Sequence, residues 1–305
     1  MGFCLVLGLI LPAMAQTGRA PVPDAAKQRA IAKLVEETYE LSKLDSTTKK
    51  QQAVKKLLET TSDESLSLDE RYVVLITLIK LTQGISDFTS WQEAVERLGT
   101  TFDIDAGKET SKHLKAYLES TTSSAAFKAK VVEEITDIIQ QAARDNRYGD
   151  ADSLLAATDE VAVRVKASSA IKQTLAKARD SVAERQKAWK QFQAASTKLA
   201  ANADDPAANL IAGRWQAVYE SNWPAAATLF LKSKDAKWKG AAELEQKAPQ
   251  VPAEQARVGD AWWDLSQAET GSAKTALMIH AGSWYDRATP GLTSAVQKQL
   301  IAKRL

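Results

Sequence analysis

The sequence predicts an all-α fold of stacked antiparallel helix hairpins, an α-solenoid or bundle with one long heptad-patterned helix. No proline stands between Pro23 and Pro206, and glycines are few in that segment. Helices and short turns fit such a composition, because a β-rich chain shows alternating apolar runs broken by turn residues. Apolar residues recur at helical spacing, and a heptad pattern crosses residues 168–201. Short turns between the helices indicate antiparallel neighbours.

Residues 1–15 have the pattern of a signal peptide. They carry no charged side chain, run apolar from Phe3 to Leu11, and end in Ala13-Met14-Ala15, which fits cleavage after Ala15. The apolar run is too short for a membrane anchor, which needs about twenty residues. We therefore expect an exported protein, in the periplasm or at the cell surface, with no stable membrane span in the mature chain. Residues 16–23 are expected to form a flexible linker.

Composition excludes several classes of function. The 40 basic and 38 acidic residues are interspersed and give a net charge of +2, so we expect no basic face for nucleic acid. The only cysteine, Cys4, lies in the leader. The mature chain is therefore expected to have neither a disulfide nor a cysteine metal ligand.

Residues 24–120 are expected to form an N-terminal helical bundle. Its central helix follows Ser67, because Ser67 and Glu70 make a capping box and residues 72–81 are apolar nearly all round. Gly84 is expected to end this helix. One-sided apolar stripes predict further helices before and after it, at Ile31, Leu34 and Val35 and at Phe88, Trp91, Val95 and Leu98.

Residues 121–204 are expected to form a middle hairpin and the long helix. The apolar residues of this helix follow steps of three and four over several heptads, and Arg185 and Ser196 interrupt the pattern. They are Ile171, Leu175, Ala178, Val182, Trp189, Phe192 and Leu199. Such a seam pairs either with another chain or with the helix's own bundle, and in a repeat protein the second is favoured. Asp205 is expected to cap the next helix, with Pro206 in its first turn.

Residues 205–305 are expected to form a tryptophan-rich C-terminal unit, since six of the eight tryptophans lie in it. One helical face carries small residues at one end and aromatic residues at the other. Its members are Ala273, Ala276, Leu277, His280, Ala281, Trp284, Tyr285 and Ala288. The preceding helix offers Val258, Trp262 and Leu265, so the two should form a tight hairpin. Gly259-Asp260 is expected near the start of that helix.

This hairpin resembles the tetratricopeptide repeat. Ala281, Tyr285 and Ala288 match the small–aromatic–small pattern of the second helix of the repeat, and Trp262 and Leu265 match its opening pair. Glu269 stands where the family has an aromatic residue. A second copy runs from Leu210 and Gly213 to Trp223, Ala226 and Phe230, and the copies are further apart than the roughly 34 residues of the family. The resemblance implies tetratricopeptide-like packing without a regular array.

The whole chain also resembles a group of exported, uncharacterised helical proteins of planctomycete-type bacteria. The similar segments are PVPDAAKQRAIAKLVEETY, DERYVVLITLIKL, VGDAWWDL and SWYDRATPGL. The resemblance implies a helical scaffold module, in some proteins joined to carbohydrate-recognising or other surface domains. It implies no chemical activity.

No motif in the chain specifies a reaction. His280 lies on the apolar stripe and is expected to be a core histidine, whereas His113 is expected on a helix surface. Asp103 and Asp105 lack the other positions of a calcium loop, so Asp105 is expected to cap a helix. We therefore predict no catalytic residue, no cofactor and no metal site, and we predict that the protein is not an enzyme.

Three tryptophans are the candidate contacts with a ligand or partner: Trp263, Trp238 and Trp223. Adjacent helical residues point about 100° apart, so if Trp262 faces the hairpin partner, Trp263 faces another helix or solvent. One interpretation packs Trp263 against the helix around Trp238 or the tail beyond Pro290. The other makes it an exposed platform for a sugar ring or a peptide side chain.

The predicted function is that of a non-catalytic, exported helical-repeat scaffold that mediates protein–protein interaction in the cell envelope. Its partner would be a protein or peptide held through a few aromatic or arginine anchors. The alternative is a carbohydrate-binding or envelope-structural module that uses exposed aromatics of the C-terminal unit, with polysaccharide as the ligand. The sequence leaves open the identity of the partner and the oligomeric state.

Overall fold

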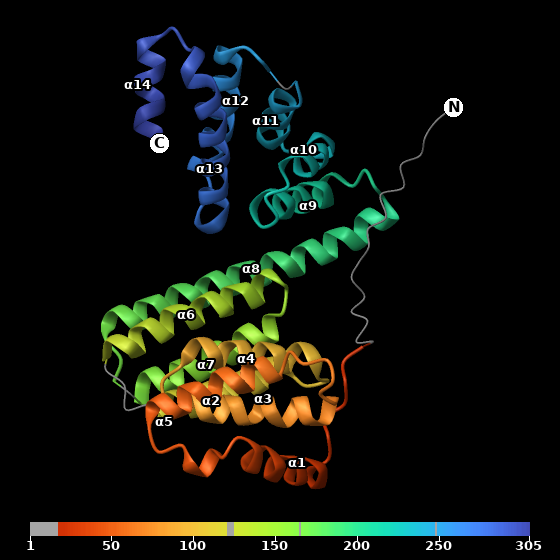
Figure 1. Ribbon diagram of the computed structural model, residues 1–305. Coiled ribbons are helices and arrows are strands. Elements are labelled where there is room, and N and C mark those ends of the chain that lie inside the picture. The colour runs from red at the N-terminus through yellow and green to blue at the C-terminus, as the bar shows by residue number, and fades with distance from the viewer. Residues whose placement is uncertain (1–17, 121–124, 165, 248) are drawn as a thin grey trace. The chain divides into compact units, whose positions relative to one another are not determined.

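The computed structural model describes residues 18–120, 125–164, 166–247 and 249–305. Over these residues it contains fourteen α-helices and two short 3₁₀ helices, so the predicted all-α class is confirmed (Figure 1). The predicted signal peptide and its cleavage site at Ala15 lie outside the described residues. In the described part of the chain, no helix combines the length and the apolar content needed to cross a membrane.

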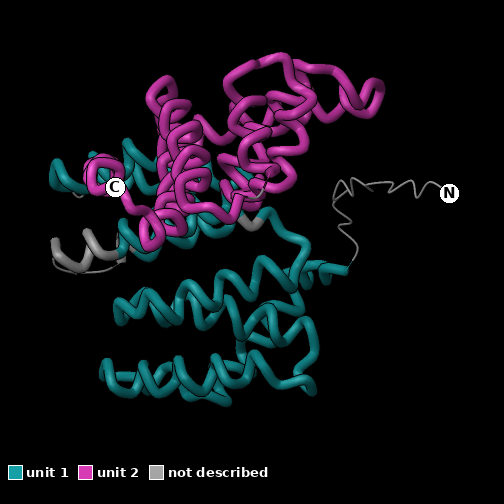
Figure 2. Tube along the Cα trace, turned by 90° about the horizontal axis from the view of Figure 1, so that it is seen from above, with its two compact units in different colours: residues 1–142, 147–178 teal, residues 143–146, 179–305 magenta. Residues whose placement is uncertain are grey.

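The helices form two compact units, which are coloured separately in Figure 2. Unit 1 consists of the residues up to 142 and of residues 147–178, and unit 2 consists of residues 143–146 and 179–305. The segment predicted as a middle region, residues 121–204, is therefore divided between the two units.

Unit 1 contains the first seven helices. They are α1 (Ala25–Thr38), α2 (Thr47–Thr60), α3 (Leu68–Gln83), α4 (Phe88–Thr101), α5 (Ala106–Ser120), α6 (Ala125–Arg144) and α7 (Tyr148–Arg164), with the 3₁₀ turn η1 (Leu41–Lys43) after α1. The last residues of α6 belong to unit 2.

Helix α3 lies at the centre of unit 1, as predicted. It packs against α1, α2, α4 and α5, and Leu75, Leu78 and Ile79 are fully buried. The capping box is formed, because Ser67 Oγ accepts from the Glu70 amide and the Glu70 carboxylate accepts from the Ser67 amide at 2.9 Å. A helix with neighbours on several sides is apolar nearly all round for that reason.

The expectation that His113 lies on a helix surface is wrong. His113 is 8% exposed and stands on α5 beside Leu114 and Tyr117, which are fully buried. Burial lowers the pKa of its imidazole, while Glu109, 3.4 Å from Nε2, acts in the opposite direction. The lysine on the preceding residue made the segment look polar, although α5 turns this face toward the core.

Helix α8 (Ser169–Ala201) carries the predicted heptad seam. In unit 1, Leu175 is 1% exposed and packs with Val132 and Ala162. In unit 2, Trp189 and Phe192 contact Trp215 with ring centroids 5.0 and 5.3 Å apart. These members of the seam therefore find partners within their own chain.

Unit 2 contains the remaining helices. They are α9 (Pro206–Val218), α10 (Trp223–Lys232), α11 (Ala236–Gln246), α12 (Pro252–Gln267), α13 (Gly271–Ala288) and α14 (Ala295–Arg304), with the 3₁₀ turn η2 (Thr289–Gly291) before α14. Asp205 caps α9 through the Ala208 amide, and Pro206 stands in the first turn, as predicted. Helices α9 and α10 form one hairpin and α12 and α13 another, with α11 packed on α10 and α12.

Each of the two hairpins has a glycine of its first helix beneath an aromatic ring of its second. A Cβ atom on Gly213 would stand 2.6 Å from the Phe230 ring, and one on Gly259 would stand 2.6 Å from the Tyr285 ring. The expected helix start at Gly259-Asp260 is therefore wrong, since α12 begins at Pro252 and Gly259 lies in its interior, against the Tyr285 ring of α13. The first turns of α12 carry few large apolar residues, so no stripe reveals them.

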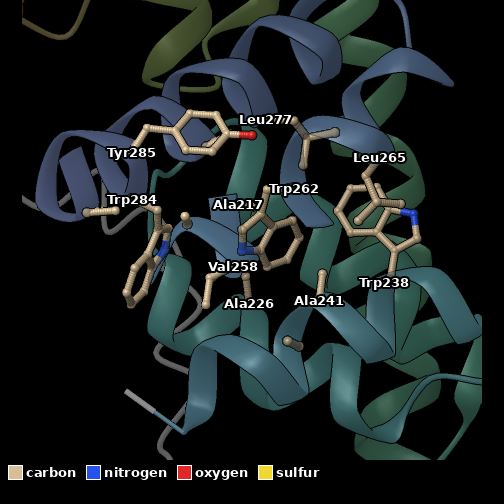
Figure 3. Close-up of a cluster of buried hydrophobic side chains, with 14 of the residues drawn as sticks. Ala217, Ala226, Trp238, Ala241, Val258, Trp262, Leu265, Leu277, Trp284 and Tyr285 are labelled. Atoms are coloured by element: carbon tan, nitrogen blue, oxygen red, sulfur yellow. The ribbon is translucent and has the colours of Figure 1, made fainter. Parts of the chain in front are cut away.

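The core of unit 2 combines large aromatic rings with alanines, as Figure 3 shows. Trp262, Leu277 and Tyr285 are at most 1% exposed and come from the second hairpin. Small residues such as Ala226 and Ala241 let the helix backbones approach, so the rings fill the remaining space. The apolar face predicted for α13 is confirmed by the burial of Leu277, His280, Ala281, Trp284, Tyr285 and Ala288.

Candidate binding site in the C-terminal unit

A largely buried carboxylate, Glu245, joins three helices of unit 2. Glu245, in the last turn of α11, accepts a hydrogen bond from Trp262 Nε1 of α12 at 2.6 Å. The same oxygen lies 2.8 Å from Nε2 of His280 on α13, and the Glu245 and His280 side chains are 15% and 10% exposed. Burying a carboxylate is unfavourable unless donors satisfy it, and these two do so. His280 is thus a core histidine whose partner comes from another helix.

Trp223 lies flat on His280. The two ring centroids are 3.6 Å apart with an angle of 3° between the planes, and Trp223 also meets Trp262 edge to face at 5.3 Å. Asn222 fixes the start of α10 by accepting a hydrogen bond from the Ala225 amide. The Trp223 side chain is half-buried. Part of the Trp223 indole is therefore accessible to a ligand, while its other side packs on His280 and Trp262.

Trp238 is part of the core. It is 3% exposed, packs on Phe230 with ring centroids 4.7 Å apart, and lies 6.1 Å from Trp262. Arg214 covers it at 5.0 Å and pairs with Glu269 at 2.6 Å. Glu269, which replaces the aromatic residue of the tetratricopeptide pattern, therefore holds an arginine of the neighbouring hairpin over the Trp238 indole of α11.

Trp263 lies on a different face of α12 from Trp262. It is half-buried, and the Arg304 guanidinium of α14 stands 5.6 Å from its ring. Arg304 also donates to Asp260 Oδ1 and to the Tyr285 hydroxyl. The Tyr285 hydroxyl donates in turn to Asp260 at 2.8 Å, and burial followed by this hydrogen bond raises the pKa of Tyr285 well above its usual range. The tail beyond Pro290 thus packs on Trp263.

The start of α13 is held by a residue of α8. Glu184 accepts hydrogen bonds from the Ser272 amide at 3.0 Å and the Ser272 hydroxyl at 3.2 Å. Thr270, the residue at the cap position, makes no capping hydrogen bond of its own. Gly271 has a φ of 58°, a left-handed conformation that favours glycine. The Glu184 carboxylate therefore supplies the negative group that a helix amino end attracts.

The three tryptophans predicted as partner contacts do not form one surface. Trp223 and Trp238 both contact Trp262, whereas Trp263 belongs to the separate group of Asp260, Tyr285 and Arg304. The burial of Trp238 leaves the predicted contact with a ligand to Trp223 and Trp263.

Two residues of these contacts, Glu245 and Arg304, were not predicted from the sequence. Glu245 had a usable signal, because it continues the buried positions Trp238, Ala241 and Ala242 of α11 at helical spacing. A carboxylate on an apolar stripe indicates a buried partner. No sequence pattern indicated the role of Arg304, since its partners Asp260 and Tyr285 lie far away in the sequence.

The chemistry open to these groups is limited by their partners. Within the described residues, no three or more histidine, cysteine, aspartate or glutamate side chains gather in a way that would hold a metal ion. Asp105 caps α5 by accepting from the Lys108 amide at 3.1 Å, as predicted. Trp223 and Trp263 offer a ligand partly exposed indoles for stacking, whereas Asp260 is already paired with Arg304.

Comparison of the chain with protein-family models, with curated proteins and with solved structures finds no match.

Proposed function

We propose that the protein is a non-catalytic scaffold whose C-terminal unit binds a protein or peptide partner in the cell envelope. The observation that carries this proposal is the exposed apolar surface of the last helices. Ile279 on α13 is 70% exposed, and Val296 and Leu300, one turn apart on α14, are 77% and 46% exposed. Val296 and Leu300 share one face of α14, and exposed apolar side chains on one face mark an interaction surface.

The hairpins of unit 2 support a tetratricopeptide-like stack. Both hairpins place a glycine beneath an aromatic ring, at Gly213 and Phe230 and at Gly259 and Tyr285. Scaffolds of this kind hold their partners with a few aromatic and arginine anchors, and the half-exposed Trp223 and Trp263 are of that type. The leader pattern of residues 1–15 supports export.

A pull-down from envelope extract tests the proposal. The wild-type chain is compared with the double variant Ile279→Ser and Leu300→Ser, and with a control that changes two exposed apolar residues of unit 1, Leu34 and Val163, to serine. We expect a specific protein that the wild type and the control retain and the double variant loses. Recovery of no specific protein, or equal recovery by all three, would contradict the proposal.

The second candidate function is carbohydrate binding, which the half-buried state of Trp223 and Trp263 favours. An indole that is partly exposed and braced by its neighbours is a suitable surface for a sugar ring. A glycan array separates this function from the first. Retention of a polysaccharide by the wild type and by Lys239→Ala, but not by Trp263→Ala, would support it, and no retention would rule it out.

A further inference from the structure

Helix α14 rests on unit 2 through very few side chains. Between Ala295 and Leu305, Ile301 is 4% exposed and Arg304 is half-buried, and every other residue is exposed. The Leu305 side chain reaches α13 near Gly282 while staying 66% exposed. The docking of α14 therefore depends on an apolar residue and an arginine three positions later, which share one face of the helix.

The surface that receives Arg304 has the chemistry of an arginine site. Asp260 accepts from the guanidinium, the Tyr285 hydroxyl contacts it, and Trp263 lies beneath it at 5.6 Å. A planar guanidinium can pair with a carboxylate and stack on an aromatic ring at the same time, and a lysine ammonium matches this geometry less well. Asp264, four residues after Asp260 and exposed, adds a second negative charge to this face of α12.

This surface is built without help from α14. Asp260 and Trp263 lie on α12 and Tyr285 lies on α13, the two helices of one hairpin. The hydrogen bond from Tyr285 to Asp260 fixes the carboxylate, and the close contact of Gly259 with the Tyr285 ring fixes the ring. Departure of α14 would leave these groups in place, with the face of Trp263 uncovered and the Asp260 carboxylate without its ion pair to Arg304.

We propose that Asp260, Trp263 and Tyr285 form a docking site for an arginine-bearing helix, filled by α14 in the free protein and by a partner's helix in the complex. The partner's helix carries an apolar residue followed three positions later by arginine, as Ile301 and Arg304 do. Charge complementarity selects such a helix, because the site is acidic while residues 294–305 contain Lys298, Lys303 and Arg304 and no acidic residue. The inference rests on the proposed binding role and names the chemistry of the partner.

A peptide-binding measurement on the full chain tests the site. The variant Arg304→Ala vacates it, and the probe is a fluorescein-labelled peptide of residues 292–305. We expect this variant to bind the peptide at least tenfold more tightly than the wild type, because the tethered α14 competes at a high effective concentration. Adding Asp260→Asn to the variant, or replacing arginine with alanine in the peptide, should abolish binding.

Arg287→Ala is the matched control, since it removes a different guanidinium of unit 2, which lies 4.8 Å from the ring of Trp284. It should bind the peptide no better than the wild type. Peptide affinity that is unchanged by Asp260→Asn, or by replacing the peptide's arginine with alanine, would overturn the proposal. Hydrogen exchange on the wild type gives a second test without any substitution, because amides of α14 should exchange much faster than those of α12 and α13, and equal protection would overturn it.

These outcomes are separable from those of the envelope pull-down. Peptide docking without a captured envelope protein would leave the site standing and remove the proposed function. A captured protein whose retention is unaffected by Asp260→Asn would leave the function standing and remove this site.

Discussion

Replacing Gly259 with alanine tests whether the second hairpin of unit 2 is limited by backbone approach. A Cβ atom there would stand 2.6 Å from the Tyr285 ring and 3.2 Å from the Ala281 carbonyl oxygen. The first distance is about 1 Å short of the roughly 3.5 Å at which carbon atoms make ordinary contact. Tyr285 cannot yield freely, because Asp260 holds its hydroxyl.

Two effects of opposite sign compete in this substitution. Alanine is favoured over glycine in a helix interior by about 1 kcal/mol, whereas overpacking a filled core costs about 1–3 kcal/mol. Because the contact is so short, we expect the cost of overpacking to lie in the upper part of its range, at about 2–3 kcal/mol. After subtraction of the gain in helix propensity, Gly259→Ala should lower the free energy of unfolding by about 1–2 kcal/mol. Gly240→Ala in α11 is the matched control, since its Cβ meets nothing within 4 Å. It should stabilise the protein by about 1 kcal/mol.

Tryptophan fluorescence during urea unfolding measures both effects, because seven of the eight tryptophans lie in residues 179–305 and report on unit 2. The midpoint should fall for Gly259→Ala and rise for Gly240→Ala. A rise for both variants would refute the claim that the Gly259–Tyr285 contact sets the spacing of α12 and α13.

Three further predictions concern the buried polar groups and the core. Glu245→Ala leaves the Trp262 and His280 donors without their acceptor, so the free energy of unfolding of unit 2, measured with urea, should fall by about 2–5 kcal/mol. Glu245→Gln keeps an acceptor and should cause a smaller fall. Equal falls for the two variants would contradict the role of the hydrogen bonds. Burial lowers the pKa of His113 in the folded protein, so between about pH 6.5 and that lower pKa the unfolded chain binds more protons and stability should fall as the pH drops. In thermal melts between about pH 7 and pH 5, the midpoint of His113→Gln should depend less on pH than that of the wild type. The same pH dependence in both proteins would contradict the burial of this imidazole. Leu75→Ala empties a fully buried position of α3 and should lower the stability of unit 1 by about 2–5 kcal/mol in circular dichroism melts; a loss below about 1 kcal/mol would show that α3 is not at the centre of the unit.

Local features of the fold could be predicted because their causes lie within a few residues. The capping box at Ser67 and Glu70 and the Asp205-Pro206 helix start need only neighbouring residues. The buried face of α13 follows from helical periodicity alone.

Features that depend on long-range partners could not be predicted. His113 sits among polar residues in the sequence, and only the packing of α5 shows that it is buried. The start of α12 was misplaced because its first turns lack a stripe and Val251, at the cap position, makes no side-chain hydrogen bond. The role of Glu269 in holding Arg214 over Trp238 required the neighbouring hairpin to be placed first.

The capping of α13 by Glu184 affects how the chain can be divided for study. The carboxylate and the helix that it caps are 88 residues apart, so a fragment of residues 205–305, the unit suggested by the sequence, would lack it. Such a fragment would also lose Trp189 and Phe192, the α8 rings that cover Trp215. Recombinant expression of the C-terminal half should therefore begin before Ser169, so that the whole of α8 is present when the hairpins fold. During synthesis, α8 leaves the ribosome before α13, and the capping group is already available when α13 emerges.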